Sequence, residues 1–375
     1  MVPNLRFNNN PYKKYNLYEF ATRVTRKNKD NVSNLPLTIS AQYGLVDQVS
    51  FFNKTVASKD MSGYYLLKNG EFAYNKSYSN DYPWGAIKRL DLYNMGCLST
   101  LYICFKSNDN IVNSNYLVHY FESPKWHKQV ADIAGEGARN HGLLNIAVND
   151  FFNTKHAVPT IENQIKIARF LDLIEERIQT QSKIINDYKL LKKYITKSFI
   201  KQKGTSYLLS EIAELGRGRV ISSAEISKQK NPIYPVYSSQ TSNNGVMGYL
   251  DNYDYEGEYI TWTTDGANAG TVYYRNGKFN CTNVCGILKI KNGFDAYYIS
   301  NILNCHTKKY VSTNLANPKL MNNVMANIKI NLPSVERQKY FSNILKAIEY
   351  RVKIERDIKL NLVKQKVFLL KNMFL

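Results

Sequence analysis

The feature that most constrains this chain is a long segment that occurs twice. The stretch VPTIENQIKIARFLDLIEERI (158–178) returns as LPSVERQKYFSNILKAIEYRV (332–352), at a constant interval of 174 residues. The proline, glutamate and glutamine that begin the first copy, Pro159, Glu162 and Gln164, all recur in the second. A segment repeated at a fixed interval indicates a duplicated structural unit, so we expect the chain to build one long element twice.

Each copy carries the signals of a long amphipathic helix, at about 160–200 and 334–374. Thr160 and Ser334 occupy the N-cap position after a proline, and a carboxylate follows where the positive helix end favours it. Apolar residues then recur at heptad-like steps, which is typical of helices that pair. The positions expected to form the seam are Leu171, Ile174, Ile178 and Tyr188 in the first copy and Leu345, Ile348, Val352 and Leu362 in the second.

Two arrangements of these helices fit the pattern. Each helix could pack on its own globule, or the two could pair as an antiparallel coiled coil. A helix of about 39 residues is about 58 Å long, at ~1.5 Å per residue, which is longer than one small globule covers. We therefore predict pairing.

The regions outside the helices are predicted to be α+β globules. Both are rich in aromatic and β-branched residues, Gly and Asn. The expected strands are 63–72, 99–105, 257–262, 271–274 and 285–290, with a turn at 275–277, and helical patches follow at 115–134 and 295–310. Each globule thus runs from strands to helices. The predicted organisation is a globule at 1–158, a helix at 159–205, a globule at 206–332 and a helix at 333–375.

The charge of the chain points to a polyanionic partner. The sequence has 50 Lys and Arg against 30 Asp and Glu, a formal net charge of +20. Such a field attracts nucleic acid or an acidic membrane surface, and charge alone leaves DNA, RNA and ribosomal binding open. The two helical segments carry 10 basic residues each, against 5 and 4 acidic ones. A basic rod of this kind could follow a phosphate backbone, although basic residues often only solvate a helix.

Cysteine usage and the N-terminus favour a soluble cytoplasmic protein. The five cysteines are scattered and odd in number, as expected in a reducing compartment. Cys281 and Cys285 lack the spacing and the partners of a zinc site, so no metal is expected. The N-terminus lacks the apolar core of a signal peptide, and no run approaches the ~18–20 apolar residues of a membrane span.

The sequence lacks a recognisable catalytic constellation. No phosphate-binding G-x-x-x-x-G-K-[ST] motif is present, and neither is the [DN]-P-P-[YFW] loop of an amino-methyltransferase. The five histidines are far apart and none is paired with a nucleophile. We therefore predict that the chain is not an enzyme by itself.

What the chain does contain is polar loops with the residue types that read DNA. Arg and Lys suit guanine edges, Asn and Gln suit adenine, and Ser and Thr suit phosphates. A polar loop is more often a solvated turn than a reader, so each stretch alone is a weak signal. The candidates are Arg23, Arg26, Lys27, Asn75, Lys76, Lys88, Arg89 and Arg139 in the first globule, and Arg217, Arg219, Ser238, Ser239, Gln240, Asn243, Asn244, Asp265 and Asn268 in the second.

The layout adds a geometric argument. Two reading globules at the ends of a spacer would contact two half-sites a fixed distance apart, since sites on one face of DNA recur at about one helical turn, ~34 Å. The first globule is longer and its loops differ from those of the second. The two should therefore read different sequences, which predicts an asymmetric bipartite site.

Several of these stretches resemble the specificity subunits of type I restriction–modification systems. The resemblance rests on 158–178 and its repeat 332–352, on the Tyr207–Ala213 segment that opens the second globule, on YPVYSS (234–239) within it, and on the ending KNMFL (371–375). It covers essentially the whole chain. The opening of the first globule, Tyr15–Ala21, matches Tyr207–Ala213 only loosely.

The resemblance implies a division of labour among subunits. Each globule would be a target-recognition domain for double-stranded DNA. The helices, called conserved regions in that family, would set the spacer and dock two methyltransferase subunits. Those subunits would use S-adenosylmethionine, and restriction subunits that use ATP and Mg would join them in bacterial defence against foreign DNA. This chain itself would hold no cofactor. The alternatives are a related system with a fused restriction and methylation partner, a coiled-coil DNA-binding scaffold and, third, a free-standing enzyme.

Overall fold

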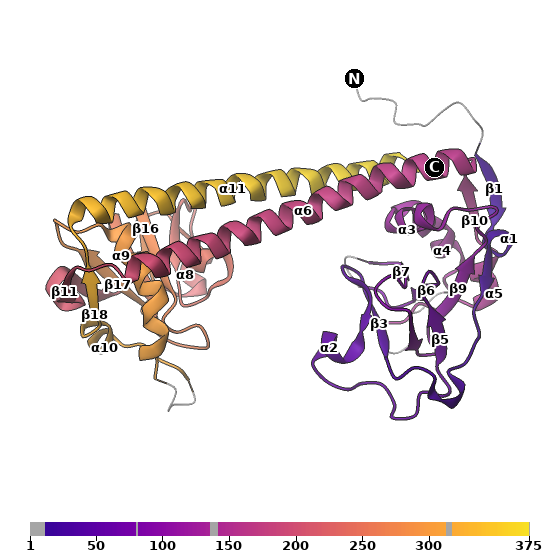
Figure 1. Ribbon diagram of the computed structural model, residues 1–375, viewed down its shortest axis with the longest axis horizontal. Helices are drawn as coiled ribbons and strands as arrows, with labels where there is room; N and C mark the ends of the chain where they lie inside the picture. Colours follow the sequence, from indigo (N-terminus) through magenta and orange to yellow (C-terminus); the bar gives the residue numbers. More distant parts are fainter. Residues whose placement is uncertain (1–11, 80–81, 136–141, 313–316, 375) are drawn as a thin grey trace, which may run out of the picture. The chain divides into compact units, whose positions relative to one another are not determined.

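The computed structural model describes residues 12–79, 82–135, 142–312 and 317–374. The chain forms two compact units, one of residues 1–181 with 358–375 and one of residues 182–357. We call them unit 1 and unit 2. Each contains one α+β globule together with one part of each of two long helices (Figure 1). The α+β class and the two long helices predicted from the sequence are confirmed.

The repeated segments form the two long helices, α6 (Ile161–Ile200) and α11 (Val335–Asn372). Both begin two residues after the repeated proline. No helix in the described ranges has a stretch apolar enough to cross a lipid bilayer.

In unit 1 the first part of α6 packs against the last part of α11. Leu171 is fully buried in one core cluster with Leu370 and Phe374. An ion pair between Lys366 Nζ and Glu175 Oε2 (2.6 Å) links the two helices. The end of α11 therefore belongs to the core of the first globule, although more than 200 residues separate the two in sequence.

In unit 2 the last part of α6 packs against the first part of α11. The rings of Phe199 and Phe341 stack at 3.8 Å between centroids. Lys192 forms an ion pair with Glu349, eight residues further along α11. Because the contacts advance along one helix as they recede along the other, the helices are antiparallel within this unit. The predicted antiparallel pairing is thus present.

The globule of unit 1 is built around a four-stranded sheet. The sheet order is β2-β9-β6-β7, and smaller two-stranded sheets pair β3 with β4, β5 with β8 and β1 with β10. The elements are β1 Lys13–Asn16, α1 Leu17–Phe20, β2 Ala21–Arg23, β3 Leu37–Ser40, β4 Gly44–Asp47, α2 Gln48–Phe52, β5 Tyr65–Lys68, β6 Phe72–Asn75, β7 Ala86–Arg89, β8 Met95–Leu98, β9 Ile103–Ser107, α3 Ser114–Glu122, α4 His127–Ile133, α5 Val148–Phe152 and β10 Lys155–Val158. Its core is aromatic: the rings of Phe72 and Phe105 stack at 5.3 Å, and those of Tyr74 and Phe151 at 4.9 Å.

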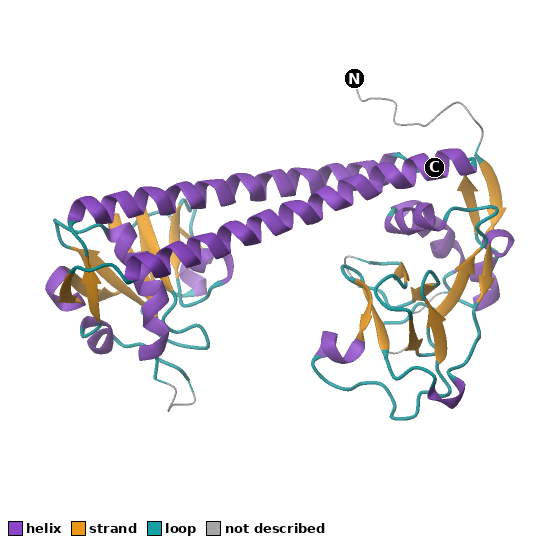
Figure 2. Ribbon diagram, in the orientation of Figure 1, coloured by secondary structure: helices purple, strands orange, loops and turns teal. Residues whose placement is uncertain are grey.

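The globule of unit 2 contains a six-stranded sheet in the order β12-β17-β15-β16-β13-β14. Its elements are β11 Thr205–Leu208, α7 Leu209–Ile212, β12 Ala213–Arg217, α8 Ser223–Ser227, β13 Tyr234–Tyr237, β14 Val246–Leu250, β15 Tyr255–Thr263, β16 Val272–Cys281, β17 Cys285–Ile290, α9 Ala296–His306, α10 Asn322–Ala326 and β18 Lys329–Leu332. Helix α9 lies against this sheet (Figure 1). Its buried Tyr298 and Ile302 belong to the same core cluster as Ile260 and Leu288 of the sheet. The predicted order of strands first and helices last is only partly correct. The larger helices follow the main sheet in each globule, but short helices lie among the strands, and a last strand, β10 or β18, closes each globule (Figure 2).

Several predicted boundaries are wrong. The predicted turn at 275–277 lies inside the continuous strand β16. Gly277 (φ +110°) is paired with Gly257 (φ +105°) on β15. The Arg-Asn-Gly sequence therefore forms a local distortion within two paired strands and not a turn.

In unit 1 the runs 63–72 and 99–105 each contain a turn that the sequence reading passed over. Gly70 (φ +82°) separates β5 from β6, and the Tyr102 N–H bonds to the Ser99 carbonyl between β8 and β9. The helical patch at 115–134 is two helices, broken at Pro124 because proline cannot donate a backbone hydrogen bond.

The two globules share one frame despite their different lengths. In unit 1, β1 pairs antiparallel with β10, and in unit 2, β11 pairs antiparallel with β18. A one-turn helix follows the first strand in each. Its start is capped by a glutamate that accepts a backbone N–H: Glu19 from Asn16 (2.7 Å) and Glu211 from Leu208 (2.6 Å). Tyr15–Ala21 is therefore the structural equivalent of Tyr207–Ala213, although the two sequences match loosely.

The repeated glutamine has the same structural role at the start of each long helix. Gln164 and Gln338 are both 1% exposed. In unit 2, the Gln338 side chain accepts the Asp295 N–H (3.1 Å) and donates to the Pro333 carbonyl (2.8 Å). In unit 1, Gln164 does the same with Asn113 N–H (2.7 Å) and the carbonyl of Pro159 (2.8 Å). Each glutamine thus ties its long helix to the N-cap residue of the helix that packs on it.

This arrangement predicts a large stability effect for Gln338→Leu. The substitution leaves the partly buried Asp295 N–H and the buried Pro333 carbonyl without their Gln338 partners, and a buried group left without a partner costs about 1–3 kcal/mol. We expect the free energy of unfolding to fall by roughly 2–4 kcal/mol in urea titrations of the whole chain followed by circular dichroism. Lys339→Leu, at the exposed neighbouring position, is the control and should change stability by less than about 0.5 kcal/mol. Equal stability of the two variants would refute the role given to Gln338.

Candidate nucleic-acid interface

In unit 2, most of the predicted reading residues converge on three adjoining loops. We call residues 238–245, 264–270 and 317–319 the three-loop surface. The Asn268 side chain donates to Thr241 Oγ1 (3.1 Å), which joins the first loop to the second. The Gly266 N–H donates to the Pro318 carbonyl (3.0 Å), which joins the second to the third. The surface carries Ser238, Ser239, Gln240, Asn243, Asn244, Asp265 and Asn268.

The first loop has an unusual backbone conformation. Asn243 (φ +48°), Asn244 (φ +52°) and Gly245 (φ +83°) are consecutive left-handed residues. Asparagine tolerates this region better than most side chains do. The Ser238 N–H bonds to the Gly245 carbonyl (2.9 Å) and closes the loop. Both asparagine side chains are exposed, so their amide groups can reach a partner.

The second and third loops combine an acceptor with a cation. Asp265 accepts a hydrogen bond from Thr264 Oγ1 (2.5 Å) and lies 3.7 Å from Lys319 Nζ. Asp265 also forms a backbone bridge with Lys319, which fixes the two loops to each other. A carboxylate can accept from a cytosine amine, and a lysine can contact phosphate.

Two predicted arginines, Arg217 at the end of β12 and Arg219 just after it, have different surroundings. Arg219 is bound to Glu225 (2.7 Å) and Asp254 (3.1 Å). The hydrogen bond from Arg219 lowers the pKa of the Glu225 carboxyl, and the same bond raises the pKa of Arg219. Arg217 instead donates to the neutral side chains of Asn322 (3.2 Å) and Met321. No described carboxylate forms an ion pair with Arg217, so its charge is the more available of the two for a phosphate or a guanine edge.

In unit 1 the predicted basic residues are dispersed. Strand order puts Arg23 on β2 at one edge of the four-stranded sheet and Lys88 and Arg89 on β7 at the other edge. Lys88 is paired with Glu122, and Arg89 with Asp91 (2.7 Å). Much of the positive charge of β7 is therefore balanced within the globule.

The remaining predicted residues of unit 1 also have internal contacts. Arg26 is paired with Glu71 (2.7 Å), and Lys27 Nζ donates to the Gly63 carbonyl (2.8 Å). Asn75, the last residue of β6, accepts the Ser77 N–H (3.0 Å), and Lys76, in the loop that follows, donates to the Ile146 carbonyl (3.4 Å). Arg139 lies outside the described residues.

The seam residues predicted on the long helices divide into two groups by exposure. Leu171, Ile178, Leu345, Ile348 and Val352 are buried, and Ile174, Tyr188 and Leu362 are half-buried. Other apolar side chains of the same helices are exposed, among them Leu173, Leu190, Tyr194, Tyr340 and Tyr350. The helices therefore present an apolar surface beyond the one used for pairing.

Sequence reasoning missed the residues beneath the three-loop surface. Arg275 is 7% exposed, and its guanidinium lies against the rings of both Tyr237 and Tyr273. Burial lowers the pKa of Arg275, but arginine remains protonated because its ordinary pKa is so high. The alternation in VYYRNGKFN (272–280) was a signal for a strand with Arg275 on one face, and the glycine of the apparent turn concealed it.

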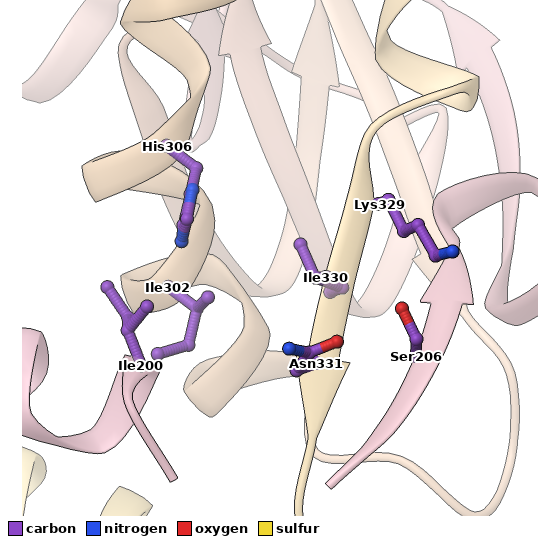
Figure 3. Close-up of a pocket in the computed structure, with 7 residues that line it drawn as sticks. All are labelled: Ile200, Ser206, Ile302, His306, Lys329, Ile330 and Asn331. Carbon is purple, nitrogen blue, oxygen red and sulfur yellow. The ribbon is translucent and has the colours of Figure 1, made fainter. Parts of the chain in front are cut away.

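One pocket in unit 2 lies away from these loops. It has a volume of about 250 Å³ and is lined by Ile200, Ser206, Ile302, His306, Lys329, Ile330 and Asn331. Figure 3 shows Ile200 and Ile302 on one side, with Lys329 and Ser206 on the other. Burial lowers the pKa of His306, and the nearby charge of Lys309 lowers it further. The lining has neither a carboxylate nor a thiol to act with His306, so the pocket does not form an acid–base pair.

Comparison with known proteins gives consistent results. Residues 204–365 match the family model described as type I restriction modification DNA specificity domain. A Mycoplasma pneumoniae protein assigned as type I specificity subunit S.MpnORF201P is 39% identical over 196 residues, covering 51% of this chain and 81% of that protein. The specificity subunit of the type I restriction enzyme MpnII, from the same organism, is 42% identical over 146 residues, covering 38% of this chain and 43% of that one.

Solved structures resemble the chain over its whole length. The crystal structure of the type I restriction–modification S subunit from M. genitalium has a TM-score of 0.58 with 15% sequence identity. The match covers 100% of this chain and 99% of that chain. At this identity the likeness concerns the fold, and it includes both globules and both long helices.

Proposed function

Because the chain belongs to the type I restriction–modification specificity subunits, we propose that each of its globules reads one half of an asymmetric, bipartite DNA site. It is the DNA-recognition component of such a system. The finer assignment, of one half-site to each globule, is supported above all by one observation: two globules built on a common frame differ in their loops. A common frame indicates that both globules have the same role, and different loops indicate that they recognise different DNA sequences.

The three-loop surface supports a reading role for unit 2. Its asparagines can form paired hydrogen bonds with adenine, and Asp265 can accept from the cytosine amine. Arg217 and Lys319 supply positive charge for phosphate contacts, which position a protein without specifying sequence. In unit 1 the ion pairs of Arg26, Lys88 and Arg89 leave less free positive charge. We therefore assign DNA reading to this globule as a whole and not to particular loops.

The long helices serve the assembly rather than the reading. We propose that they set the separation of the half-sites and dock two methyltransferase subunits, and that restriction subunits join that complex. The exposed apolar residues on both helices, such as Leu190 and Tyr350, support a docking role. S-adenosylmethionine would then be bound by the methyltransferase, and ATP and Mg by the restriction subunits. This chain would bind no cofactor and would catalyse no step.

A direct experiment tests this assignment. The methyltransferase partner is purified with and without this chain, and methyl transfer to plasmid DNA is measured. We expect methylation at discrete sites only when the chain is present. Methylation of the same sites by the methyltransferase alone would contradict the proposal, and so would methyl transfer by the chain alone.

The left-handed asparagines allow reading to be separated from folding. Asn243→Gly and Asn244→Gly keep the backbone conformation but remove the amide, whereas Asn→Ala adds strain of about 1–2 kcal/mol. We expect the glycine variants to remain folded and to lose about tenfold or more in discrimination at one half-site, since a paired contact to a base is worth ~1–3 kcal/mol. Initial methylation rates on DNA duplexes with single-base changes measure this. Wild-type discrimination in both glycine variants would show that the asparagines only form the turn.

A further inference from the structure

Arg275 occupies an unusual position for a charged residue. It lies on β16 and is 7% exposed. Its guanidinium carbon is 3.5 Å from the centroid of the Tyr237 ring and 4.4 Å from that of Tyr273. Tyr237 is on β13, and Tyr273 is on β16 with Arg275 itself, so the arginine contacts aromatic rings of two neighbouring strands. Stacking of this kind restricts a planar guanidinium much more than it would restrict a lysine.

The two hydrogen bonds of Arg275 connect the sheet to the first loop of the three-loop surface. Nε donates to Thr261 Oγ1 on β15 (3.1 Å). Nη2 donates to the main-chain carbonyl of Asn244 (2.8 Å). Arg275 thus connects the fully buried Thr261 of β15 to the left-handed tip of the loop.

Stability alone does not account for this residue. No carboxylate of the described ranges forms an ion pair with Arg275, so a buried cation is held by neutral oxygens and aromatic faces only. Removing a charge from water costs several kcal/mol, and an apolar residue of similar volume is often at least as stabilising. The guanidinium instead fixes the geometry of its neighbours. Its donors point in set directions in one plane, so the acceptors and rings around it must take one arrangement.

The loop is packed directly onto this guanidinium. A Cβ added at Gly245 would lie 3.2 Å from Arg275 Nη2 and 3.2 Å from the Gln240 carbonyl, so the loop backbone has little room to shift. Asn243 and Asn244 precede this glycine with exposed side chains. The position of the Asn244 carbonyl therefore also sets the direction in which the neighbouring amide groups leave the loop.

We infer that Arg275 is a positioning residue for DNA readout, which holds the 238–245 loop in the conformation that presents Asn243 and Asn244 to the bases. The inference rests on the proposed function and deepens it. Arg275 itself does not touch DNA. It makes discrimination by unit 2 depend on a side chain beneath the reading surface.

The test compares Arg275→Met and Arg275→Lys with Lys278→Met. Arg275→Met keeps the volume, and Arg275→Lys keeps the charge but cannot make both directed bonds while stacked. Lys278 is the matched control: it is an exposed cation on the same strand, 4.5 Å from the Tyr253 ring centroid and 3.7 Å from Glu256, and it makes neither of the Arg275 bonds described above. Each variant is assembled with its methyltransferase partner, and methylation rates are measured on duplexes with single-base changes in each half-site.

We expect both Arg275 variants to lose about tenfold or more in discrimination at the half-site read by unit 2, while discrimination at the other half-site is unchanged. Lys278→Met should leave both unchanged. A merely structural role would lower the amount of active complex and leave the base preference intact. Wild-type discrimination in either folded Arg275 variant, or an equal loss at both half-sites, would overturn the inference.

Hydrogen exchange gives a second readout that does not depend on activity. The Ser238 amide, which is bonded to the Gly245 carbonyl, should exchange about tenfold or more faster in Arg275→Lys than in the wild type and in Lys278→Met. Unchanged exchange would overturn the inference even if methylation could not be assayed. The proposed function fails separately: if the wild-type complex has no preferred site, the assignment of DNA reading is wrong, whatever Arg275 does to the loop.

Discussion

Exchanging residues 206–332 for the equivalent globule of another specificity subunit should replace one half of the methylated site and leave the other half intact. The expected change is complete, because all residues of the three-loop surface lie inside the exchanged segment. The structure favours these limits, since β11 and β18 pair with each other and are exchanged almost entirely together. The helix starts that hold Gln164 and Gln338 stay in place.

The exchange must preserve the contact between the incoming globule and α11. Gln338 accepts the N–H of Asp295, and Ser342 donates to the carboxylate of Asp295 (2.5 Å). A donor globule with Asp or Asn at this N-cap keeps both bonds, so it is the better choice. The control is the reciprocal exchange of residues 1–158, which should alter the opposite half-site only. If either exchange altered both half-sites, or neither, the one-globule, one-half-site assignment would fail.

Inserting four residues after Gln181 should lengthen the gap between the half-sites while both half-sites keep their sequences. Helix α6 is continuous through this position, and four further helical residues add about 6 Å at ~1.5 Å per residue. Base pairs rise by ~3.4 Å, so a change of about one or two base pairs is expected. Modified-base sequencing of DNA methylated by the variant complex measures the gap.

The position of the insertion matters because both helices are anchored in the globules. A second variant therefore carries a matching insertion after Glu355, the equivalent position of the second copy, so that α6 and α11 grow equally. Four residues inserted after Lys59, in an exposed loop of the first globule, provide the control and should leave the gap unchanged. An unchanged gap in both helix variants, or altered half-site sequences, would contradict the role of the helices as the spacer.

The sequence predicted those parts of the fold that repeat or that follow a strong periodicity. The duplicated helix start, the heptad-like steps and the α+β order of each globule are local patterns with few alternative interpretations. The duplicated glutamine was visible as well, but its role was not. Gln338 bonds to Asp295, 43 residues earlier, and no local pattern shows such a contact.

The candidate site was harder to predict because charge partners are distant in sequence. Arg26 is paired with Glu71, 45 residues away, and Lys88 with Glu122, 34 residues away. A basic residue in a polar loop therefore looked available when it is partly neutralised within the globule. Arg275 was missed because an arginine followed by Asn-Gly is typical of an exposed surface turn. In the structure it lies inside strand β16 and is buried.

The most direct test of the account is the set of methylated bases in a genome that carries this chain with its partner subunits. Modified-base sequencing should reveal one motif made of two different short half-sites, separated by a gap of constant length and unspecified sequence. A continuous motif, two identical half-sites or a gap of variable length would contradict the claim that two dissimilar globules read DNA at a fixed separation.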